Sequence, residues 1–160
     1  MRLQMLFFPV SLLITLLVFG CDLGESPGPD PQNIKLEFHS GFGNVVDTFH
    51  GTLTKDLGQD GGVTVPFWFT TAEQETLRSI LVSADFVSMP DTVIAIPGLY
   101  VDPNPGVELI RVESSQVHKT VVWFFPPTDN RIQNLSTKIR DLVESTPEYK
   151  QLPPMRGGYG

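Results

Sequence analysis

Apolar and polar residues alternate along several short segments of the chain, and this pattern predicts β-strands. Residues 34–39 (IKLEFH) carry three apolar side chains at alternate positions, the period of a half-buried strand. Residues 40–44 supply glycine and asparagine for a turn, and residues 45–54 are predicted to be the returning strand. Asp47 falls on the apolar face of this strand. We expect a bulge that moves it outward, the alternative being a place near an edge.

Three further strands are predicted in the middle and second half of the chain. Residues 63–70 (VTVPFWFT) are a third candidate, and Pro66 favours an edge position or a short strand because proline cannot donate to a sheet ladder. Residues 107–113 (VELIRVE) and 118–125 (HKTVVWFF) are separated by four residues and predict a second hairpin.

An amphipathic helix is predicted in residues 70–86. Thr71 with Gln74 fits a capping box, and Thr70 with Glu73 fits it one residue earlier. At about 100° per residue, one stripe of this helix is apolar. It consists of Leu77, Ile80, Leu81 and Ala84.

A second amphipathic helix closes the domain after two prolines. Thr128 or Asp129 is the predicted N-cap. Its apolar stripe consists of Ile132, Leu135, Ile139, Leu142 and Val143. The order of elements predicts an α+β fold, in which an antiparallel β-sheet of four to five strands, built from two hairpins, carries two amphipathic helices packed on one face.

A long connection joins the first helix to the second hairpin. Residues 85–106 contain four prolines and two glycines, and connections of this length are often functional or contain a short strand, which we place within residues 92–96. Leu99, Tyr100 and Val101 lie between prolines, which lower the cost of ordering a binding loop. We therefore predict that these three residues contact a partner.

The N-terminus has the order of a secretory signal peptide. Residues 3–19 are almost wholly apolar, follow Arg2 and precede Gly20. A membrane-spanning helix is the alternative, but Pro9 interrupts the apolar run and no basic cluster follows it. We expect residues 1–20 to be removed as a signal peptide.

The only cysteine stands directly after this segment. Val18, Phe19, Gly20 and Cys21 resemble a bacterial lipobox, although Phe19 is bulkier than the usual residue at its position. The resemblance implies cleavage between Gly20 and Cys21 and acyl chains on Cys21, which would anchor the protein to a bacterial membrane on its periplasmic or outer face. Residues 22–33 are rich in proline, glycine and acids and predict a flexible linker.

The remaining chain suits one domain in residues 34–152, followed by a disordered tail in 153–160. The formal charge is −7 and becomes −8 without residues 1–20, which contain one arginine and no acid. Phosphate backbones repel so acidic a chain, and it has no basic stripe. We therefore expect that the partner is not a nucleic acid.

The side chains that carry catalysis are sparse. His39, His50 and His118 are not spaced as ligands of one metal ion, and the nucleophile and metalloprotease motifs do not occur. We predict no metal, no cofactor and no enzymatic activity.

Two apolar clusters remain, in residues 66–69 and 121–127. Residues of the second are apolar on both faces of the predicted strand, so one set must be covered by another part of the fold or by a partner. Trp123 and Phe125 are the candidate anchors. The sequence thus predicts a non-catalytic protein-binding module of the cell envelope, acting on an envelope protein or a protease, with a structural subunit of envelope assembly as an alternative.

Four segments also resemble the layout of emfourin-like proteins, which inhibit the thermolysin-like metalloprotease protealysin. These segments are residues 38–45, 70–90, 107–124 and 126–144. The resemblance implies a small α+β domain that blocks such a protease. The chain differs from that family by one glycine fewer in the first turn, an insertion around residues 55–69 and the predicted lipid anchor, and no inhibitory residue is transferred.

Overall fold

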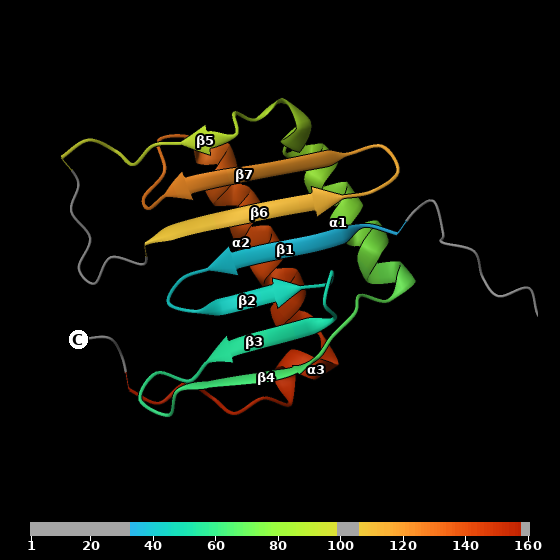
Figure 1. Cartoon of the computed structure of the whole chain (residues 1–160), viewed down its shortest axis with the longest axis vertical. Coiled ribbons are helices and arrows are strands. Elements are labelled where there is room, and N and C mark those ends of the chain that lie inside the picture. The colour runs from blue at the N-terminus through green and yellow to red at the C-terminus, as the bar shows by residue number, and fades with distance from the viewer. Residues whose placement is uncertain (1–32, 99–105, 158–160) are drawn as a thin grey trace, which may run out of the picture.

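The structure is a computed structural model, and it describes residues 33–98 and 106–157 (Figure 1). Its strands are β1 (Lys35–Ser40), β2 (Asn44–Asp47), β3 (Thr52–Asp56), β4 (Gly62–Pro66), β5 (Thr92–Val93), β6 (Val107–Glu113) and β7 (His118–Phe124). Its helices are α1 (Thr71–Ser83), the 3-10 helix η1 (Phe86–Ser88), α2 (Asn130–Ser145) and α3 (Pro147–Lys150). Within these two ranges, no helix is both long and apolar enough to cross a membrane. The predicted signal peptide, lipidated cysteine and most of the linker fall on residues outside them.

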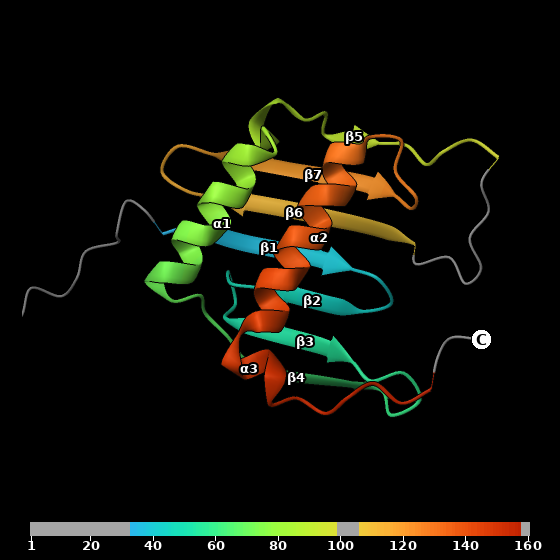
Figure 2. The same ribbon diagram turned by 180° about the vertical axis from the view of Figure 1, so that it is seen from behind.

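The strands form one mixed sheet in the order β4-β3-β2-β1-β6-β7-β5. Every neighbouring pair is antiparallel except β5 and β7, which are parallel. Figure 2 shows α1 and α2 lying side by side across the same face of the sheet. The predicted α+β class is therefore confirmed, but the prediction of four to five antiparallel strands is wrong, because the sheet has seven strands and one of them is parallel.

The predicted strand in residues 45–54 is in fact two strands, β2 and β3, joined by a turn. Asp47 ends β2, and its Oδ1 accepts hydrogen bonds from the backbone N–H groups of Phe49 and His50 at 2.9 and 3.1 Å. An aspartate that binds the backbone two and three residues ahead closes a turn. The expected bulge at Asp47 is therefore wrong, and the acid belongs to a turn between two antiparallel strands. Pro66, by contrast, ends β4 at the edge of the sheet, as predicted.

The two main helices begin at residues that cap them. Thr70 and Glu73 form the capping box of α1, in which Glu73 Oε2 accepts the Thr70 N–H at 2.8 Å. Of the two predicted boxes, the earlier one is present. Asp129 caps α2 by accepting the N–H of Arg131 at 2.9 Å. All five residues of the predicted apolar stripe of α2 are buried.

The core lies between the sheet and the two helices. Leu36, Ile110 and Trp123, from three neighbouring strands, are at most 1% exposed and face Leu77 of α1 and Leu135 of α2 in one apolar cluster. Burying each such side chain contributes roughly 1.5–3 kcal/mol to folding. Stability is therefore concentrated on the face of the sheet that the helices cover.

The predicted disorder of residues 153–160 is wrong for part of that segment. The N–H of Arg156 donates to the carbonyl oxygen of Leu57 at 3.1 Å, and the carbonyl of Arg156 accepts the N–H of Gln59 at 3.2 Å. The loop between β3 and β4 therefore pairs with this segment through a bridge between Gly58 and Arg156. Residues 158–160 lie outside the described part of the chain.

Candidate open-face binding site

The second face of the sheet carries no helix in the described residues (Figure 1). We call it the open face. It bears Glu37 of β1 and, by the register of strand pairing, Asp47 of β2, Thr52 of β3, Arg111 of β6 and Thr120 of β7. A candidate site for a partner must lie here or at an edge, because the other face is closed by α1 and α2.

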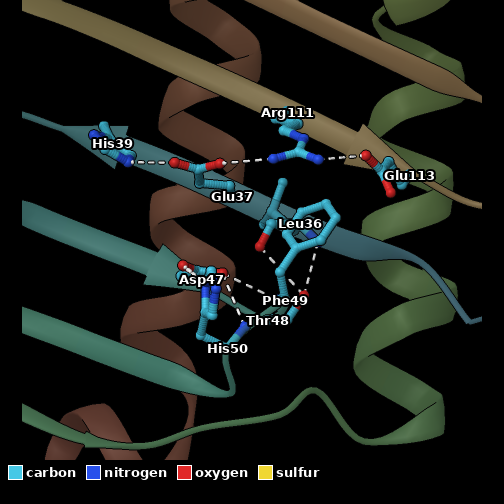
Figure 3. A network of polar contacts seen from close by, with 9 residues as sticks. All are labelled: Leu36, Glu37, His39, Asp47, Thr48, Phe49, His50, Arg111 and Glu113. Carbon is cyan, nitrogen blue, oxygen red and sulfur yellow. Dashed lines mark hydrogen bonds and ion pairs between the residues drawn. The ribbon is translucent and has the colours of Figure 1, made fainter.

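A row of charged side chains crosses the middle of the open face (Figure 3). Glu37 Oε1 lies 2.9 Å from His39 Nε2, and Glu37 Oε2 lies 3.7 Å from Arg111 Nη1. Arg111 Nη2 donates to Glu113 Oε1 at 2.5 Å. This hydrogen bond lowers the pKa of Glu113 and raises the pKa of Arg111. We call these four residues the charged row. The charged groups of this row interact mainly with one another.

Phe49 covers part of the charged row from the turn between β2 and β3. The guanidinium carbon of Arg111 lies 4.4 Å from the centre of the Phe49 ring, and Lys35 Nζ lies 5.7 Å from it. Both distances suit cation–π contacts. Arg111 is thus held by two carboxylates and one ring, which makes it a fixed part of the surface.

Asp47 and His50 form a carboxylate–imidazole pair at the same turn. Asp47 Oδ2 lies 2.6 Å from His50 Nδ1. Burial raises the pKa of Asp47, but hydrogen bonds and charge from His50, with the N–H of Phe49, outweigh burial and lower it. Pairs of this kind serve in acid–base catalysis, but here the same carboxylate also closes a turn. In the described residues, no group of three or more His, Cys, Asp or Glu side chains is arranged to hold a metal ion.

An exposed apolar cluster occupies the corner of the open face where β5, β6 and β7 meet. Val107 and Phe124 are register partners and are 52% and 44% exposed. Ile94 follows Val93, the partner of Trp123, so it comes beside Phe124, and it is 61% exposed. The half-buried Leu109 and Val122, also register partners, continue the cluster. We call these five residues, Ile94, Val107, Leu109, Val122 and Phe124, the apolar corner.

The predicted partner-binding residues differ in burial, and some of them lie outside the described residues. Trp123 is 1% exposed on the helix side of β7, so its prediction as an anchor is wrong. Phe125 is half-buried, and Leu99, Tyr100 and Val101 lie outside the described residues. Phe124 is the exposed aromatic of this strand. A strand that is apolar on both faces does not reveal in sequence which face the helices cover, so the pattern alone missed Phe124.

Trp68 is a second exposed aromatic that the sequence did not single out. Its neighbours Phe67 and Phe69 are buried with their ring centres 4.9 Å apart, whereas Trp68 is 64% exposed. Its ring lies against Gly51, where an added Cβ would stand 2.1 Å from Trp68 Cζ2. The sequence signal that could have identified Trp68 as exposed is the alternation of side chains between the two faces of the strand predicted in residues 63–70.

Comparison of the chain with models of protein families, with curated proteins and with solved structures found no match. Its function is therefore inferred from the geometry of the open face and from the sequence of its N-terminus.

Proposed function

We propose that this chain is a bacterial envelope lipoprotein whose domain binds a partner protein through the apolar corner and catalyses no reaction. The observation that carries the proposal is the exposure of three apolar side chains at one corner of the sheet: Val107 of β6, its register partner Phe124 of β7, and Ile94, which directly follows β5. Contiguous exposed apolar side chains mark interaction sites on soluble domains. Aromatic residues among them are frequent energetic centres of protein interfaces.

The charge of the chain favours a partner with a basic rim around an apolar centre. The open face carries more carboxylates than cations. The carboxylates are Glu37, Asp47, Asp56 and Glu113, and the cations are Lys35 and Arg111. An acidic surface steers and orients a basic partner and repels nucleic acid and anionic lipid. We therefore expect an envelope protein, with a secreted metalloprotease among the candidates.

The N-terminal sequence supports the proposed location. The lipobox-like residues that end at Cys21 would place acyl chains there, and multiple chains hold a protein far more firmly than a single one. Residues 22–33 would span roughly 35 Å if extended. The domain would thus stand clear of the bilayer with its open face free to meet a partner.

The pairing of ionisable side chains supports a non-catalytic role. His39 and His50 each contact a carboxylate at 2.9 and 2.6 Å. Asp47 is also bound by two backbone N–H groups of its own turn. These groups therefore stabilise the open face, whereas the apolar corner offers exposed apolar surface that a partner can bury.

Site-specific photocrosslinking in intact cells tests the proposal. A photocrosslinking amino acid at position 124 should capture one envelope protein, whereas the same amino acid at Met155, which is 53% exposed near the opposite edge of the sheet, should not capture it. Val107→Asp, introduced together with the probe at 124, should lower this capture at least tenfold.

Equal capture from both positions, or capture that Val107→Asp leaves unchanged, would contradict the proposal. A thermolysin inhibition assay with the same variant identifies the class of partner: inhibition that Val107→Asp abolishes would make the partner a metalloprotease.

A further inference from the structure

A pocket of about 570 Å³ opens at the C-terminal end of α1, between η1 and the turn that joins β6 to β7. Its floor is apolar and consists of buried side chains: Ile34, Leu81, Phe86 and Val112. The apolar corner lies at the beginning of β6 and the end of β7, whereas this pocket lies at the end of β6 and the beginning of β7. The two sites are therefore separate.

The rim of the pocket is also apolar on one side. Val82 and Val87 line it and are 74% and 64% exposed. Asp85 produces this arrangement, because its backbone adopts a left-handed conformation with φ 51° between α1 and η1. Such a conformation reverses the chain at a helix end. This turn places Phe86 in the floor of the pocket and places Val82 and Val87, which stand on either side of the turn, at the mouth of the pocket.

The polar residues of the rim give the pocket a cationic side. Arg78, Ser115 and Gln116 line the rim and are exposed. Asp85 also lines it, but its carboxylate hydrogen bonds with the Ser88 hydroxyl, which lies 3.5 Å from Arg131 Nη1. The charge of Asp85 is thus directed toward a serine and an arginine outside the pocket, and Arg78 supplies the positive charge among the lining residues.

We propose that this pocket binds a single-chain amphiphile with an anionic head, of which a fatty acid and a lysophospholipid are the two sources. The acyl chain would lie on the apolar floor and against Val82 and Val87, and the head would meet Arg78. The volume falls within the roughly 300–1,000 Å³ typical of small-molecule sites, and so does the combination of an apolar lining with a few polar groups. Charge complementarity with Arg78 selects an anionic head over a cationic one.

The position of the pocket agrees with such a ligand. Ile34, which lies in its floor, directly follows the predicted linker that leads to Cys21. If Cys21 is acylated, as proposed above, the pocket lies on the side where the chain comes from the membrane. Only this supply of ligand rests on the proposed anchor, since binding itself depends on the described residues alone.

Photolabelling of the full chain in neutral phosphatidylcholine vesicles tests the proposal. The probe is palmitate with a diazirine in its acyl chain, and the labelled residues are mapped by digestion and mass spectrometry. We expect saturable labelling at Ile34 and within residues 78–88 and 112–117, which together form the pocket. Unlabelled palmitate or lysophosphatidylglycerol should compete, and the stronger of the two identifies the source. Hexadecyltrimethylammonium, which has an equally long chain and a cationic head, should compete at least tenfold less well.

Variants at the rim separate binding in the pocket from nonspecific contact. Val87→Asp should reduce labelling at least tenfold, whereas Met155→Asp, a matched change at another exposed apolar residue, should leave it unchanged. Arg78→Gln should bring the anionic and cationic competitors close to equal strength. Circular dichroism confirms that each variant is folded.

Labelling that does not saturate, that spreads over other exposed apolar residues, or that persists in Val87→Asp would overturn the proposal. The readout is independent of photocrosslinking from position 124. Failure of the pocket proposal can therefore be distinguished from failure of the proposed function of the apolar corner.

Discussion

Trp123 and Phe124 are neighbours on β7, yet the first is 1% exposed and the second is 44% exposed. Trp123 faces α1 and α2 across the core, and Phe124 lies on the open face beside Val107. Successive side chains of a strand point to opposite faces, so one step along the chain moves an aromatic ring from the core to the surface. The same residue class therefore stabilises the fold on one face and is available to a partner on the other.

The two faces of the sheet also differ in the kind of side-chain contacts that they make. On the closed face, apolar side chains from the sheet meet the apolar stripes of two helices. On the open face, charges are paired with each other and partly covered by Phe49. Exposed ion pairs contribute little to stability, whereas buried apolar contacts contribute much. The closed face should dominate the free energy of unfolding, and the open face should tolerate substitution.

The largest expected effect comes from removing the buried ring. Trp123→Ala should lower the free energy of unfolding by about 3–5 kcal/mol, because it leaves a large cavity in the core. Phe124→Ala should lower it by about 1 kcal/mol or less, since the ring is already half in solvent. Urea denaturation followed by circular dichroism measures both. Trp123→Phe keeps the comparison measurable if the alanine variant does not fold, and equal losses at the two positions would contradict the assignment of the faces.

A smaller effect is expected where Trp68 lies on a glycine. Gly51 has φ 68°, and a Cβ there would stand 2.1 Å from the Trp68 ring. Gly61 has φ 79° with no atom within 4 Å of its added Cβ, so Gly61→Ala is a matched control for backbone strain alone. Strain costs both variants roughly 1–2 kcal/mol. Gly51→Ala should lose about 1–3 kcal/mol more from overpacking.

Urea denaturation gives the difference between these two glycine variants, and tryptophan fluorescence reports movement of the ring in Gly51→Ala. Equal losses of stability would show that Trp68 yields freely and is not held in place by the turn. In that case Trp68 would be a mobile surface side chain, unlike the fixed residues of the charged row.

The features that sequence could predict are those set by neighbours along the chain. The capping box at Thr70 and the stripe that includes Leu135 identified α1 and α2, because caps and 3.6-residue periodicity are local. β5 was anticipated only as a short strand, since its parallel pairing joins Val93 to Trp123, thirty positions away in the chain.

The open face was harder to predict for a related reason. Whether Trp123 or Phe124 points outward depends on where the helices pack, which alternation within one strand does not specify. Asp47 conflicted with the apolar pattern of its strand, and only its hydrogen bonds to the backbone of the next turn resolve the conflict. Local patterns therefore identified most of the elements, whereas the open face depends on how these elements are arranged in space.

The turn at Asp47 predicts a modest dependence of stability on pH. The pKa of Asp47 is lower in the folded state than the usual value of about 3.9 in an unfolded chain. Its contribution is therefore fully present above the unfolded value and is lost as pH falls through the folded value. Asp47→Asn keeps an oxygen to accept the backbone N–H groups and removes the charge, so its stability should fall less steeply below about pH 4.

Urea denaturation at several pH values tests the Asp47 prediction, with Asp60→Asn as a control for the loss of one charge from a loop. A steeper acid dependence in Asp47→Asn than in the parent chain would contradict the assigned direction of the pKa shift. No change at all would show that the turn is held by its backbone and not by the carboxylate.

The smallest effect is expected in the charged row. Arg111→Gln should lower the free energy of unfolding by about 1 kcal/mol, because it removes exposed ion pairs worth about 0–1 kcal/mol and one cation–π contact of similar size. The part due to Glu37 and Glu113 should shrink in 1 M salt, where the Debye length is about 3 Å, and the part due to Phe49 should remain. A double-mutant cycle of Arg111→Gln with Phe49→Leu separates the two. A loss above about 3 kcal/mol would contradict the difference between the two faces, because it would mean that the open face supports the fold as strongly as the closed face does.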